Sequence, residues 1–434
     1  MRIPAFIRDN LLLKITSLNS LVIGIRLVVS FFIQRLLAIL VGEEGISKIG
    51  QLRNLTQLLT SLASFGIFSG VVKYVAEYKE DSEQLQKLFS TSLLFVLIGT
   101  VVTALLLFFG ANPISERLFT STDYAYLIKI LAVLVPVISI HRIFTGVVNG
   151  LSMYKKYAKI DLFGYLASAV LMIFFLYEYN IDGALLAIAL TPLIQLTVLL
   201  VIFTKTLKEY IQFSKLRIMT SFGKGLLAFS LMSFFSSVLL NYVELDIRTM
   251  IMTRITEADA GIWTAMTFIS KNYMVFSGGL FTLYVLPKFA SITTEKAFKH
   301  ELITIYKTLL PLFGIGMVVI YLLRDYIILL IYPDFTEMAP LFKWQLLGDF
   351  LRLASLVLLH QFLAKKLVRS FIFSELISLG LFYGLSYYLV DIYGVEGVVM
   401  AHFLRYIVYL MVVLFLVLRY FKKQKRNTTN PSDA

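Results

Sequence analysis

Residues 341–366 read LFKWQLLGDFLRLASLVLLHQFLAKK, a mostly apolar stretch that also contains Lys343, Asp349 and Arg352. The stretch exceeds the roughly 20 residues that a helix needs to cross a bilayer. A charged side chain at membrane depth costs at least about 2.5–3.5 kcal/mol, so it normally faces a partner or a hydrated cavity. Asp349 and Arg352 share one helical face, and they either tie helices together or belong to a functional site.

The composition identifies a polytopic membrane protein. Of 434 residues, 58% are hydrophobic and only 15% are charged, whereas ordinary soluble domains are about 45–50% apolar. The net charge of +13 needs no nucleic acid partner, because basic residues accumulate on the cytoplasmic loops of membrane proteins. The chain has no cysteine, which excludes disulfides, thiolate catalysis and cysteine metal sites.

Apolar stretches of spanning length recur along the whole chain. We expect twelve transmembrane helices, at about 12–40, 46–77, 84–110, 123–149, 155–178, 182–205, 222–252, 259–287, 297–322, 336–363, 367–390 and 396–419. Lysine and arginine concentrate on alternate connecting loops, including those at both ends of the chain. The positive-inside rule therefore predicts that both termini lie in the cytoplasm, with an even number of spans.

The chain contains an internal repeat. A shift of 214 residues places NIDGA at 180–184 on GVEGV at 394–398, and Leu127 on Leu341. Because each half has six helices, both halves enter the membrane in the same sense, as in parallel repeats. We predict an N-terminal lobe (1–207), a cytoplasmic amphipathic linker (208–221), a C-terminal lobe (222–420) and a basic cytoplasmic tail (421–434). Two short apolar segments, 113–119 and 324–332, occupy corresponding interfacial positions.

Basic residues outnumber acidic ones within the predicted helices. Arg35, Lys48 and Lys307 can extend toward the membrane surface from helix ends, whereas several other cations lie too deep for this. An excess of buried positive charge predicts a central cationic cavity with an anionic cargo. The candidate substrate-binding residues are Arg26, Arg53, Arg142, Lys271, Lys343, Asp349, Arg352 and Arg405.

Sequence signatures of catalysis are missing. No Walker loop indicates internal ATP use, and no nucleophile is accompanied by an orienting base. The four histidines, His141, His300, His360 and His402, have no metal-binding spacing, so each is expected to be a buried histidine bonded to a neighbour. We expect no enzyme activity, no cofactor and no metal site.

A lipid-linked diphosphate sugar fits the expected surfaces. Arginine presents a planar fork to phosphate oxygens, the glycan needs a hydrated path, and a polyprenyl tail needs apolar helix faces. We expect the diphosphate to pair with Arg26, Arg53, Lys271 and Arg352 while the two lobes rock between inward-open and outward-open states.

Five motifs point to a known family. They are RNL at 53–55, GIFSGVVKYVAEY at 66–78, GIW at 261–263, LYVLP at 283–287 and LFKWQLLGD at 341–349. The chain resembles the polysaccharide flippases of the multidrug/oligosaccharidyl-lipid/polysaccharide (MOP) exporter superfamily, particularly those for enterobacterial common antigen and O-antigen units. Arg53, Trp344, Gln345, Gly348 and Asp349 lie within these motifs; the other deep cations are predicted from burial alone.

The resemblance implies a fold and a function. The fold would be two six-helix lobes around a V-shaped cationic cavity in the bacterial inner (plasma) membrane. The function would be transfer of an undecaprenyl-diphosphate-linked oligosaccharide from the cytoplasmic to the periplasmic leaflet. Membrane lipids are expected partners, and the family also suggests a polysaccharide polymerase and chain-length machinery.

Two other functions stay open. A multidrug or cation antiporter of the same superfamily would need carboxylates at the cavity centre, whereas this interior is basic. A non-transporting scaffold in envelope glycan assembly would tolerate replacement of the buried cations. Asp349 is either a proton relay or a structural tether for Arg352, and we favour the tether.

Overall fold

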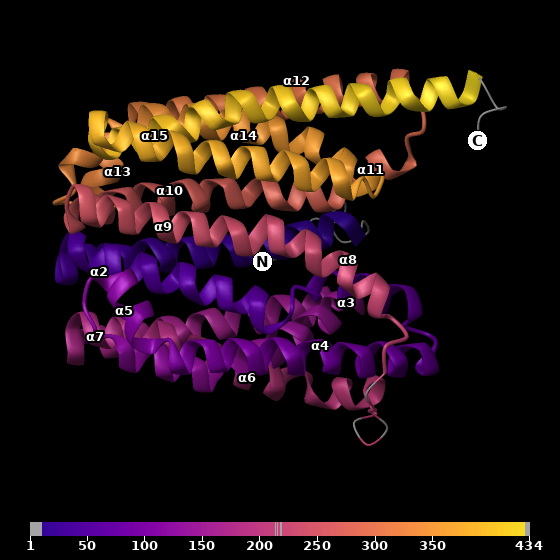
Figure 1. Cartoon of the computed structure of the whole chain (residues 1–434), viewed down its shortest axis with the longest axis horizontal. Coiled ribbons are helices and arrows are strands. Elements are labelled where there is room, and N and C mark those ends of the chain that lie inside the picture. Colours follow the sequence, from indigo (N-terminus) through magenta and orange to yellow (C-terminus); the bar gives the residue numbers. More distant parts are fainter. Residues whose placement is uncertain (1–10, 213, 215, 218, 430–434) are drawn as a thin grey trace. The chain divides into compact units, whose positions relative to one another are not determined.

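The computed structural model describes residues 11–212, 214, 216–217 and 219–429, and the regular structure of these residues is entirely helical (Figure 1). The described part of the first 245 residues contains the α-helices α2 (Leu11–Ala63), α3 (Phe68–Tyr78), α4 (Ser82–Phe109), α5 (Ala111–Phe119), α6 (Ala125–Gly150), α7 (Tyr154–Tyr210) and α8 (Gly223–Ser233). Helix α9 (Leu239–Arg254) contains the boundary between two compact units, Met1–Leu245 and Asp246–Ala434. The second unit continues with α10 (Glu257–Leu280), α11 (Leu286–Ser291), α12 (Glu295–Leu322), α13 (Arg324–Ile331), α14 (Leu341–Ala364) and α15 (Val368–Thr429).

The helices confirm the predicted all-α membrane fold. Eight helices of the described chain are long and apolar enough to cross a membrane. Three of them are each divided by one residue with a non-helical backbone, namely Gly42 in α2, Asn180 in α7 and Gly394 in α15. Helices α10 and α11 occupy the remaining predicted stretch, 259–287. Each of the twelve predicted stretches therefore has a helical counterpart.

The divided helices α7 and α15 are antiparallel hairpins. In α7, the Lys156 ammonium donates to the Thr206 hydroxyl at 2.5 Å, although the two residues are 50 positions apart. In α15, the Tyr409 hydroxyl donates to a Glu375 carboxylate oxygen at 2.6 Å. These contacts require the second arm of each helix to run back along the first.

The backbone reproduces the internal repeat. Asn180 and Gly394, which the 214-residue shift places together, have φ values of 52° and 59°. The same shift relates Ser152 to Lys366, and both have φ of 55° at the turn between two long helices. Left-handed φ is rare outside glycine. Matching left-handed residues at both turns therefore show that the two halves share one backbone plan.

One predicted span is interrupted. The apolar stretch 46–77 is divided between α2 and α3, with Phe65 and Gly66 at φ values of 51° and 67°. The Ser230 hydroxyl donates to the Phe65 carbonyl at 2.5 Å. A Cβ atom at Gly66 would lie 2.9 Å from the Ser233 Cβ. The close approach of α8 thus explains why the chain turns at a glycine here.

The segments between and beyond the spans are partly described. Helices α5 and α13 occupy the two predicted interfacial segments. The predicted linker 208–221 contains residues 213, 215 and 218, which lie outside the described residues, as do residues 1–10 and 430–434. Helix α15 continues to Thr429, into the predicted tail. The lobe boundaries remain a prediction.

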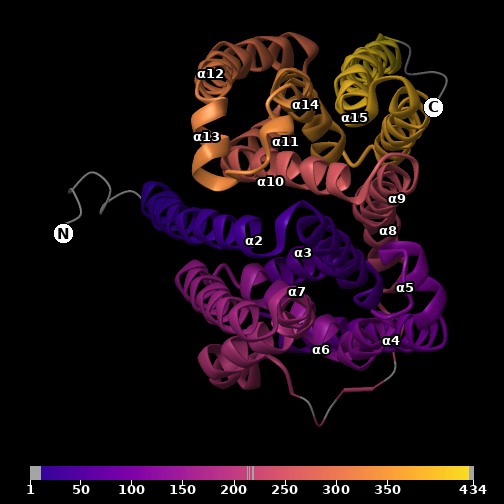
Figure 2. The ribbon, with the colours of Figure 1, turned by 90° about the vertical axis from the view of Figure 1, so that its left-hand side faces the viewer.

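Helix α14 is the centre of the second unit. It contacts α10, α12 and α15, and Figure 2 shows it between α12 and α15. Side chains on several faces of α14 are buried, including those of Leu341, Leu353, Val357 and Phe362. Any polar side chain on these faces must therefore find a partner within the protein.

Candidate functional site

Helix α14 carries a buried polar face in an otherwise apolar helix. Asp349 is 0% exposed and Gln345, one turn earlier, is 3% exposed. Because residues four apart lie on the same helical face, both side chains point toward the same neighbours. These neighbours come from α10 and α15, and the resulting network joins three helices.

One oxygen of Asp349 accepts three hydrogen bonds. The Ser270 hydroxyl of α10 donates to Oδ2 at 2.5 Å, and Gln345 Nε2 donates at 3.0 Å. The Tyr273 hydroxyl, one turn after Ser270, donates to the same oxygen. A buried carboxylate needs such donors to offset its lost hydration.

The other oxygen of Asp349 faces two basic groups. His402 Nε2 of α15 lies 3.1 Å from Oδ1, and Arg352 Nη1 lies 3.9 Å from it. Arg405 Nη2 lies 3.3 Å from the second ring nitrogen of His402, Nδ1. Because arginine only donates hydrogen bonds, Nδ1 is the acceptor, and Nε2 carries the proton donated to Asp349.

Gly348 allows α15 to approach this network. A Cβ atom at Gly348 would lie 2.4 Å from His402 Cδ2 and 3.2 Å from the Phe403 Cα. Real side chains do not come so close, so a larger residue would push His402 away. The glycine is therefore a requirement for the contact between His402 and Asp349.

Arg405 extends the network along α15. Its guanidinium lies 4.0 Å from the Phe382 ring centre and 4.5 Å from that of Tyr406, and it donates to the Tyr406 hydroxyl at 3.1 Å. Glu375 lies within electrostatic range of Arg405 and Arg352. Two carboxylates thus face two guanidinium groups, so the charges of this cluster balance.

The first unit holds a more accessible cation at Arg26. Its Nη1 donates to an Asp161 oxygen at 2.7 Å, with 39% and 29% of the two side chains exposed. The guanidinium also lies 4.9 Å from the Tyr165 ring centre, one turn further along α7. Such a cation–π contact orients the guanidinium plane.

Arg142 is a second oriented cation of the first unit. Its guanidinium lies 3.7 Å from the Phe68 ring centre. Tyr157 lies within electrostatic range of Arg142, Arg26 and Asp161. Arg26 and Arg142 therefore belong to one neighbourhood.

The remaining predicted residues are dispersed. Arg53 is half-buried, whereas Lys271 and Lys343 are exposed. Lys343 Nζ lies 4.6 Å from the Trp344 ring centre. The structure thus brings together Asp349, Arg352 and Arg405, and Lys343 lies apart from them near the beginning of α14.

Sequence reasoning missed Ser270 and Tyr273, and it treated His402 as an ordinary buried histidine. The expectation that His402 bonds to a neighbour is confirmed. One signal was present: each of the three apolar helices contributes to the network two polar residues that are three positions apart. The pairs are Ser270 and Tyr273, Asp349 and Arg352, and His402 and Arg405.

The two clusters of charged residues differ in what they can do chemically. Within the described ranges, no group of three or more His, Cys, Asp or Glu side chains could hold a metal ion. Guanidinium groups held on aromatic rings can receive phosphate oxygens in a defined orientation. The Asp349 network instead satisfies its own charges.

Comparisons with known proteins identify the family of the chain. A family model described as "Polysaccharide biosynthesis protein" matches residues 12–293. The chain is 30% identical over 383 residues to the lipid III flippase of Escherichia coli (strain K12), covering 86% of this chain and 90% of that protein. The same identity and coverage hold for the lipid III flippase of Shigella flexneri.

Solved structures show the same fold at low sequence identity. An inward-facing multidrug resistance MATE family transporter of the MOP superfamily matches with a TM-score of 0.78 and 14% identity, covering 94% of this chain and 96% of that chain. The lipid II flippase MurJ in an inward closed conformation matches with a TM-score of 0.73 and 17% identity, covering 94% and 90%. The chain belongs to the polysaccharide biosynthesis protein family and has the MOP transporter fold.

Proposed function

We propose that this protein is a flippase for an undecaprenyl-diphosphate-linked oligosaccharide of the enterobacterial common antigen or O-antigen type. The observation that carries the proposal is the similarity to a lipid III flippase over 86% of the chain. Transport proceeds from the cytoplasmic to the periplasmic leaflet by alternating access, without enzymatic chemistry. The similarity to multidrug transporters concerns the fold alone, so it does not favour a drug substrate.

Cations of each unit are the proposed diphosphate ligands. Arg26 and Arg142 are held against aromatic rings, which leaves guanidinium donors oriented for phosphate oxygens. Arg53, Lys271 and Arg352 complete the proposed set. The membrane potential assists the outward step, because it contributes about 2.3 kcal/mol per charge per 100 mV.

Asp349 acts as a structural tether in this proposal. Its two oxygens are occupied by donors from three helices. Its closest basic partner is His402 at 3.1 Å, whereas Arg352 is 3.9 Å away. This geometry supports a role in holding α10, α14 and α15 together. Arg352, whose side chain is 29% exposed, is the member of this cluster proposed to contact the phosphate.

The proposed setting is the bacterial inner membrane with both termini in the cytoplasm. The cargo and the membrane lipids are the first partners. A polysaccharide polymerase and chain-length machinery are further partners, because a flipped repeat unit is their substrate.

Complementation of a flippase-deficient strain tests the function. Wild-type protein should restore surface glycan, and well-expressed Arg26→Ala, Arg142→Ala and Arg352→Ala variants should each reduce it about tenfold, as expected for a lost charged hydrogen bond. Lys299→Ala is the matched control, since Lys299 is 55% exposed and pairs with Glu295 one turn away. Accumulated lipid-linked sugar identifies the cargo, and failure of the wild-type protein to complement refutes the proposal.

Variants of Arg26 and Asp161 distinguish a substrate-binding role of Arg26 from a structural one. If Arg26 serves only its ion pair, Arg26→Ala and Asp161→Asn should fail alike. If Arg26 binds diphosphate, Asp161→Asn should still complement because the guanidinium remains available. We expect the second result, with equal membrane expression of both variants as the control.

A further inference from the structure

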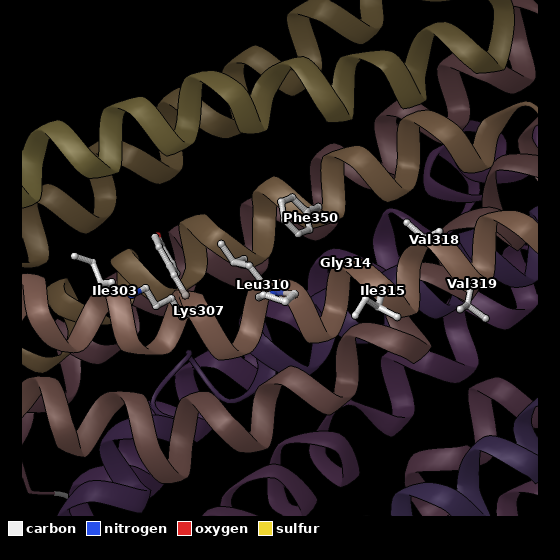
Figure 3. A pocket seen from close by; sticks show the side chains of 10 residues that line it. Ile303, Lys307, Leu310, Gly314, Ile315, Val318, Val319 and Phe350 are labelled. Carbon is white, nitrogen blue, oxygen red and sulfur yellow. The ribbon is translucent and has the colours of Figure 1, made fainter.

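A lateral groove lies between α12 and α14 in the second unit. Its main cavity has a volume of about 740 Å³ and is bordered by Lys307, Gly314, Val318 and Phe350, among others (Figure 3). A second cavity of about 480 Å³ shares Gly314, Val318 and Phe350 and continues to Tyr321 and Lys343. The two cavities therefore form one continuous groove.

The groove wall is apolar and open to the outside of the protein. Ile315 and Val318 are 68% and 58% exposed, and both line the main cavity. Gly314 leaves the space open, because a Cβ atom there would already lie 3.4 Å from the Phe350 ring. In a membrane-spanning helix, exposed apolar side chains face hydrocarbon, so the groove is suited to an aliphatic chain.

The part of the groove between Lys307 and Tyr321 is as long as one membrane leaflet. The 28 residues of α12 span about 42 Å at 1.5 Å per residue, close to the roughly 40–45 Å of a whole bilayer. Lys307 lies near the middle of α12 and Tyr321 near its end. The distance between them along the helix is about 21 Å, half of the bilayer.

An uncompensated positive charge lies at the Tyr321 end of the groove. Lys343 lines this end, and no carboxylate among the described residues pairs with it. Arg324 is nearby, with its guanidinium 4.6 Å from the Tyr321 ring centre, but its charge is offset by Asp325 at 3.6 Å. Lys307, one turn from the other end of the groove at Ile303, points back toward the beginning of α12 because helical side chains tilt that way.

We propose that this groove is a binding site for an anionic phospholipid, with its phosphate on Lys343 and one acyl chain along α12 to Lys307. The lysine charge complements the phosphate, the wall matches the chain, and the length matches one leaflet. The site goes beyond the proposed function, because this lipid is resident and not the transported cargo.

The groove and the Asp349 network lie on the same helix, α14. Phe350, which borders the groove, follows Asp349 in α14, so the two residues lie on different faces of one helix turn. Tyr306 of α12 also borders the groove and donates from its hydroxyl to the Ala354 carbonyl of α14 at 2.8 Å. A bound chain therefore supports α14 on a different side from its polar contacts.

Lipid retention by the purified full-length protein tests the site. Native mass spectrometry with added phosphatidylglycerol should show one retained lipid on the wild-type protein and none on Gly314→Leu, which fills the groove. Gly316→Leu is the matched control, because a Cβ atom at Gly316 meets nothing within 4 Å and this glycine does not line either cavity. Phosphatidylglycerol should also raise the melting temperature of wild-type and Gly316→Leu protein but not of Gly314→Leu.

The headgroup is tested with a second pair of variants. Lys343→Gln should weaken phosphatidylglycerol binding about fivefold, whereas Lys299→Gln on the same helix as the groove wall should leave it unchanged. Phosphatidylcholine should bind more weakly than phosphatidylglycerol, and inorganic phosphate should not compete. Lipid retention and the melting temperature are measured on purified protein, so their results do not depend on flippase activity.

Three outcomes would overturn the proposal. Equal lipid retention by Gly314→Leu and Gly316→Leu would show that the chain does not occupy the groove. Equal binding of phosphatidylglycerol and phosphatidylcholine would show that Lys343 does not select an anionic headgroup. A dimer that disappears in Gly314→Leu would show that a second copy of the protein covers this face.

Discussion

The two halves of the molecule share one backbone plan but carry different side chains at equivalent buried positions. The 214-residue shift relates five members of the second-half network to apolar residues of the first half. The equivalent pairs are Tyr273 and Leu59, Gln345 and Leu131, Asp349 and Val135, Arg352 and Ile138, and His402 and Ile188. All five first-half residues belong to its buried hydrophobic core.

This difference separates what the fold needs from what the protein does. The first half shows that the shared backbone closes well around hydrocarbon side chains at these positions. Buried ionic groups are often no more stabilising than apolar residues of similar volume. The polar network of the second half is therefore not a requirement of the shared backbone plan, and we predict that it also serves the transport cycle.

The largest expected effect comes from opening the network. Asp349→Ala removes the acceptor that Ser270, Tyr273 and His402 share, and it should lower the free energy of unfolding by about 3–5 kcal/mol. Asp161→Ala, at the half-exposed pair of the first half, should cost at most about 1 kcal/mol. Unfolding in detergent micelles measures both values, and equal losses would contradict the comparison.

Exchanging these five residues for their first-half counterparts should leave the free energy of unfolding unchanged or raise it. The variant has five substitutions: Tyr273→Leu, Gln345→Leu, Asp349→Val, Arg352→Ile and His402→Ile. It keeps Arg405 and Glu375, whose opposite charges compensate each other. It should be as stable as the wild-type protein or up to about 4 kcal/mol more stable. It should also fail to restore surface glycan in the flippase-deficient strain.

Normal complementation by this variant would show that the network has no part in transport. Strong destabilisation would show that the two halves are not interchangeable at these positions. Membrane expression, checked for every variant, separates the two results.

The hairpin glycines should behave alike in both halves. A Cβ atom at Gly183 would lie 1.9 Å from the Phe175 carbonyl oxygen, and one at Gly397 would lie 2.1 Å from that of Leu389. Gly183→Ala and Gly397→Ala should therefore each cost about 1–3 kcal/mol, because the backbone must shift. Thermal unfolding compares them with Gly380→Ala, where a Cβ atom meets nothing within 4 Å.

The smallest effect concerns the residue at the two hairpin turns. Asn180 adopts a φ of 52° where the second half has Gly394. Asn180→Gly should relieve this strain, and Gly394→Asn should introduce it, with changes of about 1 kcal/mol or less in opposite directions. Melting temperatures of the two single variants test this, and shifts of the same sign would contradict it.

The sequence predicted the fold well because the length of the apolar stretches and the internal repeat can be recognised without knowledge of tertiary contacts. The NIDGA and GVEGV segments mark both hairpin turns through their composition and their matching positions in the repeat. The break at Phe65 and Gly66 falls at a glycine inside a predicted span, but its cause, the approach of α8 from a distant part of the chain, is not visible in the local sequence.

The site was predicted only in part for the same reason. Spacing along one helix identified Asp349 and Arg352, but it could not reveal that α10 and α15 supply closer partners. The predicted excess of buried positive charge overlooked that Arg26 pairs with Asp161, which is 135 positions away. Residue counts record the charges, whereas only tertiary contacts decide which of them are compensated.

The single-residue turns at Asn180 and Gly394 also bear on how the chain folds. The entropy lost in closing a connection grows with its length, so joining two spanning helices through one residue costs almost nothing. Contacts next to the turn of such a hairpin are local and form quickly. Each pair of arms can therefore enter the membrane as one unit, with hardly any polar chain to carry across between its two passages.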